Sequence, residues 1–200
     1  MNNTTSEINL IFSTPIWTSH LNEYQDVNKR MEEYIKKQME LDSKGKKASN
    51  INGWHSENFN LKDEEVVFFI NTISIKIQKA MEDMGWDLKK NKIEIPNIWS
   101  IINKRGSSNA MHIHSNSYIS AAYYVKAPEK CGDIVFYDPR QSRLVRKPKI
   151  SKLNNLNGEE VNIKPTDGLL VLFPSYLYHS VNENLSNEER IVISFNVDLK

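Results

Sequence analysis

The chain has 200 residues, a length that fits one ordinary domain and can bury a hydrophobic core without disulfides. Hydrophobic residues make up 39% and charged residues 26%, which is typical of folded globular proteins rather than disordered ones. The net charge of +1 provides no strong field, so we expect neither nucleic acid nor an anionic membrane as a partner. The single cysteine, Cys131, excludes a disulfide framework and a cysteine-rich metal site.

The N-terminal stretch MNNTTSEINLIFSTP lacks the basic start and the continuous apolar core of a secretory signal peptide. No apolar run approaches the length of a membrane span. We therefore expect a cytoplasmic protein.

The first expected elements are one strand and one helix. Residues 8–21, INLIFSTPIWTSHL, are apolar and β-branched, and Pro15 interrupts them. We expect an edge strand, because proline cannot donate to a sheet ladder, and a homodimer could form through that edge. Residues 22–41 carry apolar side chains at the spacing of one helical face, which predicts a helix.

A loop and a second helix follow. Residues 42–60 are polar and contain two glycines, which predicts a loop. Residues 62–84 predict a helix, with three acidic residues in its first turn and Gly85 as its end.

Beyond Gly85 the chain consists of short β-rich runs separated by turn-forming residues. Helices followed by six or more closely spaced strands indicate an α+β domain, mainly β, with the helices packed on one sheet of a sandwich or jelly roll. We expect a single domain over 1–200, in which a helical support region (1–92) precedes the β core (93–200). The predicted strands lie within residues 93–106, 117–128, 131–140, 159–168, 169–181 and 189–199.

Three of the five histidines form the most informative pattern. His112 and His114 are two residues apart, so on a strand both imidazoles project to one face. A later β-rich run ends in FPSYLYHS and supplies His179. Three imidazoles from two strand ends of one β barrel suit a divalent iron, although two of them could also be solvent-facing residues of an ordinary strand.

The two other histidines lie outside this pattern. His20 is close to the expected edge strand, where an exposed histidine is the simpler interpretation. His55 lies beside Trp54 in the predicted loop, and residues 44–60 could form a lid over a pocket.

An arginine and a tyrosine complete the candidate site. Arg190 follows His179 by eleven residues in the last predicted strand, so an antiparallel return would bring it beside the metal. Arginine is suited to holding a carboxylate through two parallel hydrogen bonds, which indicates a carboxylate cosubstrate. Counting by twos from His114 places Tyr124 inside the barrel, where its phenol needs a hydrogen-bond partner.

Together these segments resemble the Fe(II)- and 2-oxoglutarate-dependent oxygenases, most closely a bacterial and phage group of that superfamily. The resemblance covers residues 95–200 closely and GWHSENFNL with the following helix more loosely. As a set the motifs are specific, whereas each alone would be weak. The matching segments are HIHSNSYISAAYYV, GDIVFYDPR, GLLVLFPSYLYHSV and RIVISFNV.

The resemblance implies a double-stranded β-helix, or cupin-like jelly roll, that binds Fe(II) and 2-oxoglutarate. His112 and His179 would be iron ligands, and Arg190 would bind the 5-carboxylate of 2-oxoglutarate with help from Tyr124. The implied activity is that of a dioxygenase, a hydroxylase that couples oxidative decarboxylation of 2-oxoglutarate to oxidation of a substrate. That substrate, a small molecule or a side chain, is not identified.

The chain departs from the usual pattern of that superfamily at one ligand. The first pair is usually His-x-Asp or His-x-Glu, whereas here His114 stands at the carboxylate position. Three possibilities remain open: a three-histidine iron, a two-histidine iron with His114 nearby, or a carboxylate from elsewhere. Asp138 is the nearby candidate, but Asp-Pro-Arg is typical of a strand-end turn.

Four residues are candidates for the substrate pocket. Trp99 and Asn103 lie on the strand before the His-x-His pair, and Asn109 and Asn116 are expected at the mouth. Trp99 could equally be plain core, and Asn116 could be a turn former.

Two other functions fit the same residues. A cupin-like enzyme could use three-histidine metal without 2-oxoglutarate, and Arg190 would then have no cosubstrate to bind. A non-catalytic barrel could retain the metal or another ligand without turnover.

Overall fold

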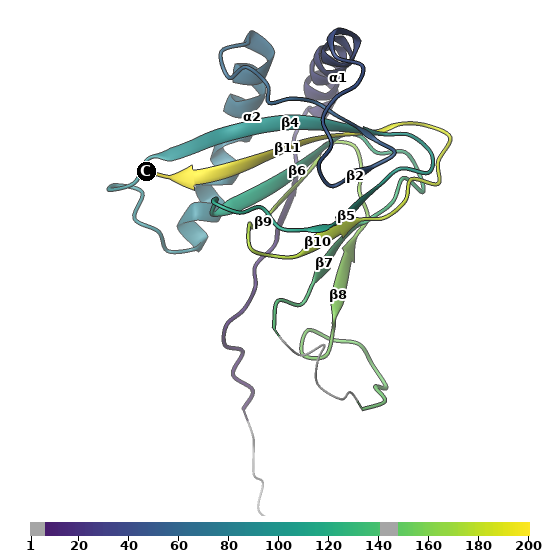
Figure 1. Ribbon diagram of the computed structural model, residues 1–200. Helices are drawn as coiled ribbons and strands as arrows, with labels where there is room; N and C mark the ends of the chain where they lie inside the picture. The colour runs from purple at the N-terminus through teal and green to yellow at the C-terminus, as the bar shows by residue number, and fades with distance from the viewer. Residues whose placement is uncertain (1–6, 141–147) are drawn as a thin grey trace, which may run out of the picture.

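The computed structural model describes residues 7–140 and 148–200 and contains two antiparallel β-sheets (Figure 1). The larger sheet has the strand order β1-β9-β6-β11-β4-β3, and the smaller has the order β2-β5-β10-β7-β8. The strands are β1 (Trp17–His20), β2 (Asn50–Ile51), β3 (Trp54–His55), β4 (Ile93–Asn103), β5 (Ser108–His112), β6 (Ile119–Lys126), β7 (Ile134–Tyr137), β8 (Glu160–Ile163), β9 (Leu169–Pro174), β10 (His179–Val181) and β11 (Arg190–Leu199).

Two helices, α1 (Tyr24–Leu41) and α2 (Glu64–Asp83), cover the face of the larger sheet that points away from the smaller one (Figure 1). Each buries one apolar stripe, as the helical spacing of the sequence predicted. Phe69 of α2 lies fully buried, with its ring 5.1 Å from that of Tyr123 and 6.2 Å from that of Phe195. The helices therefore hold the larger sheet from behind and leave its other face free.

That other face forms a second, smaller core with the inner face of the smaller sheet. Side chains alternate along β6, so Tyr123 points into the helix-side core while Tyr124 points between the sheets. Phe136 of β7 and Phe173 of β9 meet from opposite sheets, with ring centroids 4.9 Å apart. The site described below occupies the part of this inter-sheet space that apolar side chains leave unfilled.

The structure corrects the prediction for residues 42–60. They are not a free loop, because β2 pairs with β5 and β3 pairs with β4, which attaches this segment to both sheets. The reversal between the two strands uses Asn52 with φ 57° and Gly53. Two-residue strands carry too little periodicity to be recognised in a sequence.

Strand boundaries also differ from the predictions in two places. The run 169–181 forms two strands in different sheets, because Leu177 N–H donates to Pro174 O (2.9 Å) in a turn that separates β9 from β10. The N-terminal edge strand is confirmed at the edge of the larger sheet, but it is confined to Trp17–His20. Three strands from the first 92 residues join the sheets of the remaining chain, and the single-domain assignment stays a prediction.

No helix among the described residues is both long and apolar enough to cross a lipid bilayer.

We predict that Phe69→Ala lowers the free energy of unfolding by about 3–5 kcal/mol, because it leaves a cavity between α2 and the sheet. Ile75→Ala is the matched control, since Ile75 lies on the same helix with 71% of its surface exposed. That change should cost no more than about 0.5 kcal/mol. Denaturant unfolding measures both, and equal effects would contradict the packing described for α2.

Candidate metal centre

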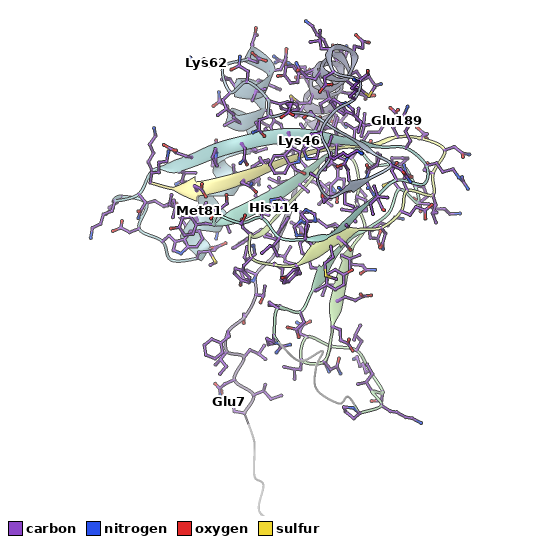
Figure 2. The ribbon with its side chains drawn as sticks, in the orientation of Figure 1. Glu7, Lys46, Lys62, Met81, His114 and Glu189 are labelled. Carbon is purple, nitrogen blue, oxygen red and sulfur yellow. The ribbon has the colours of Figure 1, made fainter. Side chains whose placement is uncertain are left out.

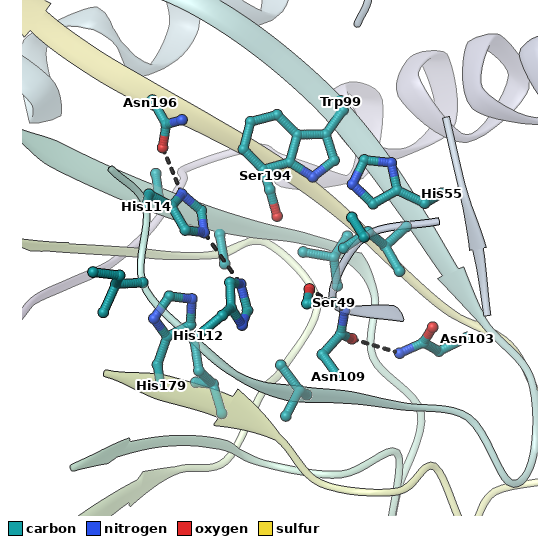
Figure 3. Close-up of a pocket in the computed structure, with 18 of the residues that line it drawn as sticks. Ser49, His55, Trp99, Asn103, Asn109, His112, His114, His179, Ser194 and Asn196 are labelled. Carbon is teal, nitrogen blue, oxygen red and sulfur yellow. Dashed lines mark hydrogen bonds between the residues drawn. The ribbon is translucent and has the colours of Figure 1, made fainter. Parts of the chain in front are cut away.

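A cavity of about 480 Å³ lies between the two sheets and is lined by polar and apolar residues from both (Figure 3). Most of the candidate residues from the sequence reach it. Those in its lining are Trp99, Asn103, Asn109, His112, His114, Tyr124, His179 and Arg190.

The three histidines converge in this cavity from adjacent strands. His112 ends β5 and His179 begins β10, and the two residues are direct partners in the antiparallel pairing. His114 follows two residues after β5, and its backbone N–H donates to Ser175 O (3.0 Å). Figure 2 places His114 between the two sheets. One nitrogen from each ring lies within 4.8 Å of the other two.

Hydrogen bonds assign the proton on each imidazole. The Nδ1 atoms lie 2.7 Å from Ala110 O for His112, 3.0 Å from Leu177 O for His179, and 2.6 Å from Asn196 Oδ1 for His114. A carbonyl oxygen only accepts, so each Nδ1 carries the proton and each neutral ring keeps its lone pair on Nε2. All three Nε2 atoms are therefore available as ligands.

Burial keeps these rings neutral. It lowers the pKa of His179 to about 3, with the neighbouring His112 adding to the shift. Burial likewise lowers the pKa of His114 to about 4 and also lowers that of His112. At neutral pH the cluster therefore presents three uncharged donors, the protonation state that metal binding requires.

The geometry fits a divalent metal ion. The Nε2 atoms of His112 and His114 are 3.3 Å apart, so their two lone pairs face each other. A cation between them removes this repulsion, and two nitrogens bound at about 2.1 Å to one ion lie about 3 Å apart. Imidazole donors suit iron among other metals of intermediate softness.

No carboxylate joins this cluster in the described part of the chain. Asp138, the carboxylate considered from the sequence, accepts from Arg140 through its backbone N–H (2.9 Å) and its guanidinium (2.7 Å). It is absent from the cavity lining. Asp138 thus makes the local turn contacts that Asp-Pro-Arg predicted.

Arg190 is almost completely buried at the start of β11 and also faces the cavity. One terminal nitrogen donates to Cys131 O, to Gly132 O (3.0 Å) and more weakly to Asn182 O (3.4 Å). Among the described residues no carboxylate lies within ion-pair distance of this guanidinium, and its other nitrogens make no hydrogen bond. A buried cation without an anionic partner is costly, so this position favours an anionic ligand.

Tyr124 lies on β6, next to β11, and is as deeply buried as Arg190. Burial raises the pKa of its phenol, so the hydroxyl stays protonated and can donate. In the described part of the chain this hydroxyl has no hydrogen-bond partner. Arg190 and Tyr124 therefore present unused donors at one end of the cavity.

A ladder of amides lines another part of the cavity. Asn103 Nδ2 donates to Asn109 Oδ1 (3.0 Å), and Asn109 Nδ2 donates to Ser49 Oγ (3.2 Å). Asn116, expected at the mouth of the pocket, does not line the cavity. It lies in an exposed turn with φ 64°. In a residue with left-handed backbone conformation, the geometry of the turn decides the direction of the side chain, and the alternation of a strand does not apply.

Residues 44–60 contribute to the lining as a fixed strap rather than as a free lid. His55 is 92% buried; its Nδ1 donates to Ser56 O (2.7 Å), and its ring is nearly parallel to that of Trp99. Ser56 N–H in turn donates to Ser100 O of β4 (3.0 Å), and Ser100 N–H donates to the side-chain Oγ of Ser56 (2.9 Å). His20, in contrast, contacts Thr166 and does not line the cavity.

Three polar residues near His114 were not singled out from the sequence. Asn196, Ser120 and Ser175 form hydrogen bonds behind that ring. Alternation from Arg190 along RIVISFN places Asn196 on the same face, so that signal was present. Counting by twos from His114 also reaches Ser120, which shares its face of β6 with Tyr124, whereas Ser175 gave no such signal because it meets Ser120 only after β6 and β9 pair.

A family model described as "Putative 2OG-Fe(II) oxygenase" matches residues 97–196. No curated protein matches the chain.

Solved structures share the fold at low sequence identity. A prolyl-4-hydroxylase from Pseudomonas putida is 12% identical with a TM-score of 0.64, covering 92% of this chain and 93% of that one. Viral collagen prolyl hydroxylase from Paramecium bursaria Chlorella virus-1, solved as a 2-oxoglutarate complex, is 13% identical with a TM-score of 0.57, covering 91% and 94%. HygX from Streptomyces hygroscopicus, with nickel, 2-oxoglutarate and hygromycin B bound, is 8% identical with a TM-score of 0.64, covering 92% and 83%. These likenesses confirm the double-stranded β-helix.

We predict that His112→Ala and His179→Ala each weaken Fe(II) or Zn(II) binding by at least about 100-fold, since losing a ligand costs more than losing a residue that orients one. His20→Ala is the control and should bind metal like the wild type. Competition with a chelator gives the affinities. A metal affinity unchanged in both cavity variants would exclude this cluster as the metal centre.

Proposed function

We propose how the site works in a chain that belongs to the family of putative 2OG-Fe(II) oxygenases. The protein is an oxygenase that depends on Fe(II) and 2-oxoglutarate and uses dioxygen.

His112, His114 and His179 would hold the iron through their Nε2 atoms. Their protonated Nδ1 atoms, their neutral state and the 3.3 Å approach of two Nε2 atoms support this assignment. His114 then replaces the carboxylate ligand of the usual facial triad, so the protein contributes no negative charge to the iron.

Arg190 and Tyr124 would bind the 5-carboxylate of 2-oxoglutarate. The observation that carries this proposal is the buried guanidinium, which has no carboxylate partner among the described residues and faces the cavity beside an unpaired phenol. A carboxylate there could accept two parallel hydrogen bonds from the guanidinium and one from the phenol. The opposite end of the same cosubstrate would then point toward the three imidazoles.

When bound, iron supplies the redox chemistry, in which dioxygen and 2-oxoglutarate give succinate and carbon dioxide while the substrate gains a hydroxyl group. The residues of the chain bind and orient around that chemistry. Phe173, Val192 and Ile134 give the cavity apolar walls that exclude water. Tyr124 keeps its proton because burial disfavours the phenolate, so it acts as a donor to the cosubstrate and not as a base.

The substrate would be a small molecule or one inserted side chain. The cavity of about 480 Å³ must also hold 2-oxoglutarate, which leaves limited enclosed space for the reacting part of the substrate. Trp99, Asn103 and Asn109 would contact it, offering one aromatic face and two amides. The described lining contains no acidic side chain, which disfavours a cationic substrate.

We also propose a cytoplasmic location, which the free and buried thiol of Cys131 supports. β1 pairs on one side only in the described part of the chain, which supports a homodimer through that edge.

We predict that anaerobic addition of 2-oxoglutarate to the Fe(II) protein produces the weak visible charge-transfer band of a chelated 2-oxo acid. Arg190→Gln should raise the 2-oxoglutarate concentration needed for the band by at least about 30-fold, because removing one partner of a buried charge pair costs about 2–5 kcal/mol. Arg105→Gln, which changes an exposed arginine, is the control.

Tyr124→Phe covers the case in which Arg190→Gln fails to fold, and it should weaken 2-oxoglutarate binding about tenfold through loss of one hydrogen bond to a charged group. If the wild type binds iron but gives no band, a three-histidine enzyme without 2-oxoglutarate replaces this proposal. A band insensitive to both variants would place the cosubstrate elsewhere.

A further inference from the structure

A closed ring of hydrogen bonds holds His114 on the Nδ1 side of its imidazole. The backbone N–H of His114 donates to Ser175 O (3.0 Å), and the hydroxyls of Ser175 and Ser120 lie 2.7 Å apart. Ser120 Oγ donates to Asn196 Oδ1 (2.8 Å). The same oxygen lies 2.6 Å from His114 Nδ1 (Figure 3). The backbone carbonyl of Ser175 and the side chains of Ser175, Ser120 and Asn196 thus fix the imidazole of His114.

Only one assignment of donors and acceptors is consistent with all the hydrogen bonds in this ring. Asn196 Oδ1 can only accept, so the protons of Ser120 Oγ and His114 Nδ1 both point at it. Ser120 has then used its proton, and Ser175 must donate to Ser120. The amide oxygen of Asn196 is therefore held toward the imidazole by a second donor.

The side chains that form this ring of hydrogen bonds are shielded from solvent. Ser120 and Ser175 are at most 1% exposed, and Asn196 is 7% exposed. Asn196 and Ser120 are direct partners in the pairing of β11 with β6. If the amide oxygen of Asn196 were removed, water would have little access to replace it as the acceptor for His114 Nδ1. The identity of residue 196 therefore decides which nitrogen of His114 carries the proton.

The alternative tautomer has a ready acceptor on the other side of the imidazole. If the proton of His114 moved to Nε2, the lone pair of His112 Nε2 at 3.3 Å would accept it. The lone pair of His114 would then point away from the other two ligand nitrogens. An acceptor at Nδ1 is what opposes this arrangement.

We propose that Asn196, held by Ser120 and Ser175, is a positioning residue that makes His114 a metal ligand through Nε2. The proposal rests on the three-histidine iron site given above and extends it to the residues that make a histidine work at a carboxylate position. Because Asn196 is an amide, it orients the imidazole without adding negative charge behind it.

The test compares two substitutions of Asn196 with Zn(II) as the probe, in competition with a chelator. Asn196→Leu keeps the size but removes the acceptor and should weaken Zn(II) binding about 10–100-fold. Asn196→Asp keeps the acceptor and should bind Zn(II) at least as tightly as the wild type. Ser120→Ala, which removes the donor that orients the amide, should give a smaller loss than Asn196→Leu. Ser194→Ala, two residues away on the same face of β11, is the control and should leave the affinity unchanged.

An NMR spectrum that correlates the imidazole ring protons with both ring nitrogens distinguishes a changed tautomer of His114 from a general disruption of the folded structure. In the Zn(II)-loaded wild type and in Asn196→Asp, His114 should carry its proton on Nδ1. Wild-type affinity in Asn196→Leu, or a loss in Asn196→Asp as large as in Asn196→Leu, would overturn the proposal. So would a proton on Nε2 of His114 in the loaded wild type. These readouts involve no 2-oxoglutarate, so they are independent of whether the charge-transfer band appears.

Discussion

The pairing of His112 with His179 across β5 and β10 is the contact on which the rest of the site depends. It brings two imidazoles from the ends of different strands to one point, with ring centroids 4.2 Å apart. β10 also pairs with β7, so the smaller sheet fixes this point from both sides. Everything else in the cavity is arranged relative to these two rings: His114 completes the donor set, and the larger sheet supplies Tyr124, Arg190 and Asn196 opposite them.

Electrostatic balance explains why these groups occur together. In the proposed site three neutral imidazoles would bind a divalent cation, a buried guanidinium lies nearby, and the described lining contains no acidic side chain. A dicarboxylate bound between the iron and Arg190, as proposed, would neutralise charge at both ends. Compared with a site that has a carboxylate ligand, this one is one charge unit more positive, which should make the iron harder to oxidise and bind anions more tightly.

Much of this could be predicted from the sequence, for identifiable reasons. His112, His114 and His179 could be found because side chains two residues apart on a strand share one face, and because His179 ends a β-rich run. Neither inference needs knowledge of the fold. Tyr124 was assigned inward by the same counting. The two helices followed from apolar spacing over about five turns each. The strap containing His55 was taken for a loop, because two-residue strands are defined only by the partners β4 and β5. The carbonyls that hold Arg190 and the serines behind His114 come from segments far apart in the chain, so only the folded sheets bring them together.

The most direct test of the account is a crystal structure of the Fe(II) protein grown anaerobically with 2-oxoglutarate, with anomalous data at the iron edge. We expect one iron peak within about 2.2 Å of the Nε2 atoms of His112, His114 and His179, a distance typical of metal–imidazole bonds. The distal carboxylate of 2-oxoglutarate should accept hydrogen bonds from Arg190. An iron bound by two imidazoles and a protein carboxylate, or a His114 turned away from the metal, would contradict the three-histidine centre.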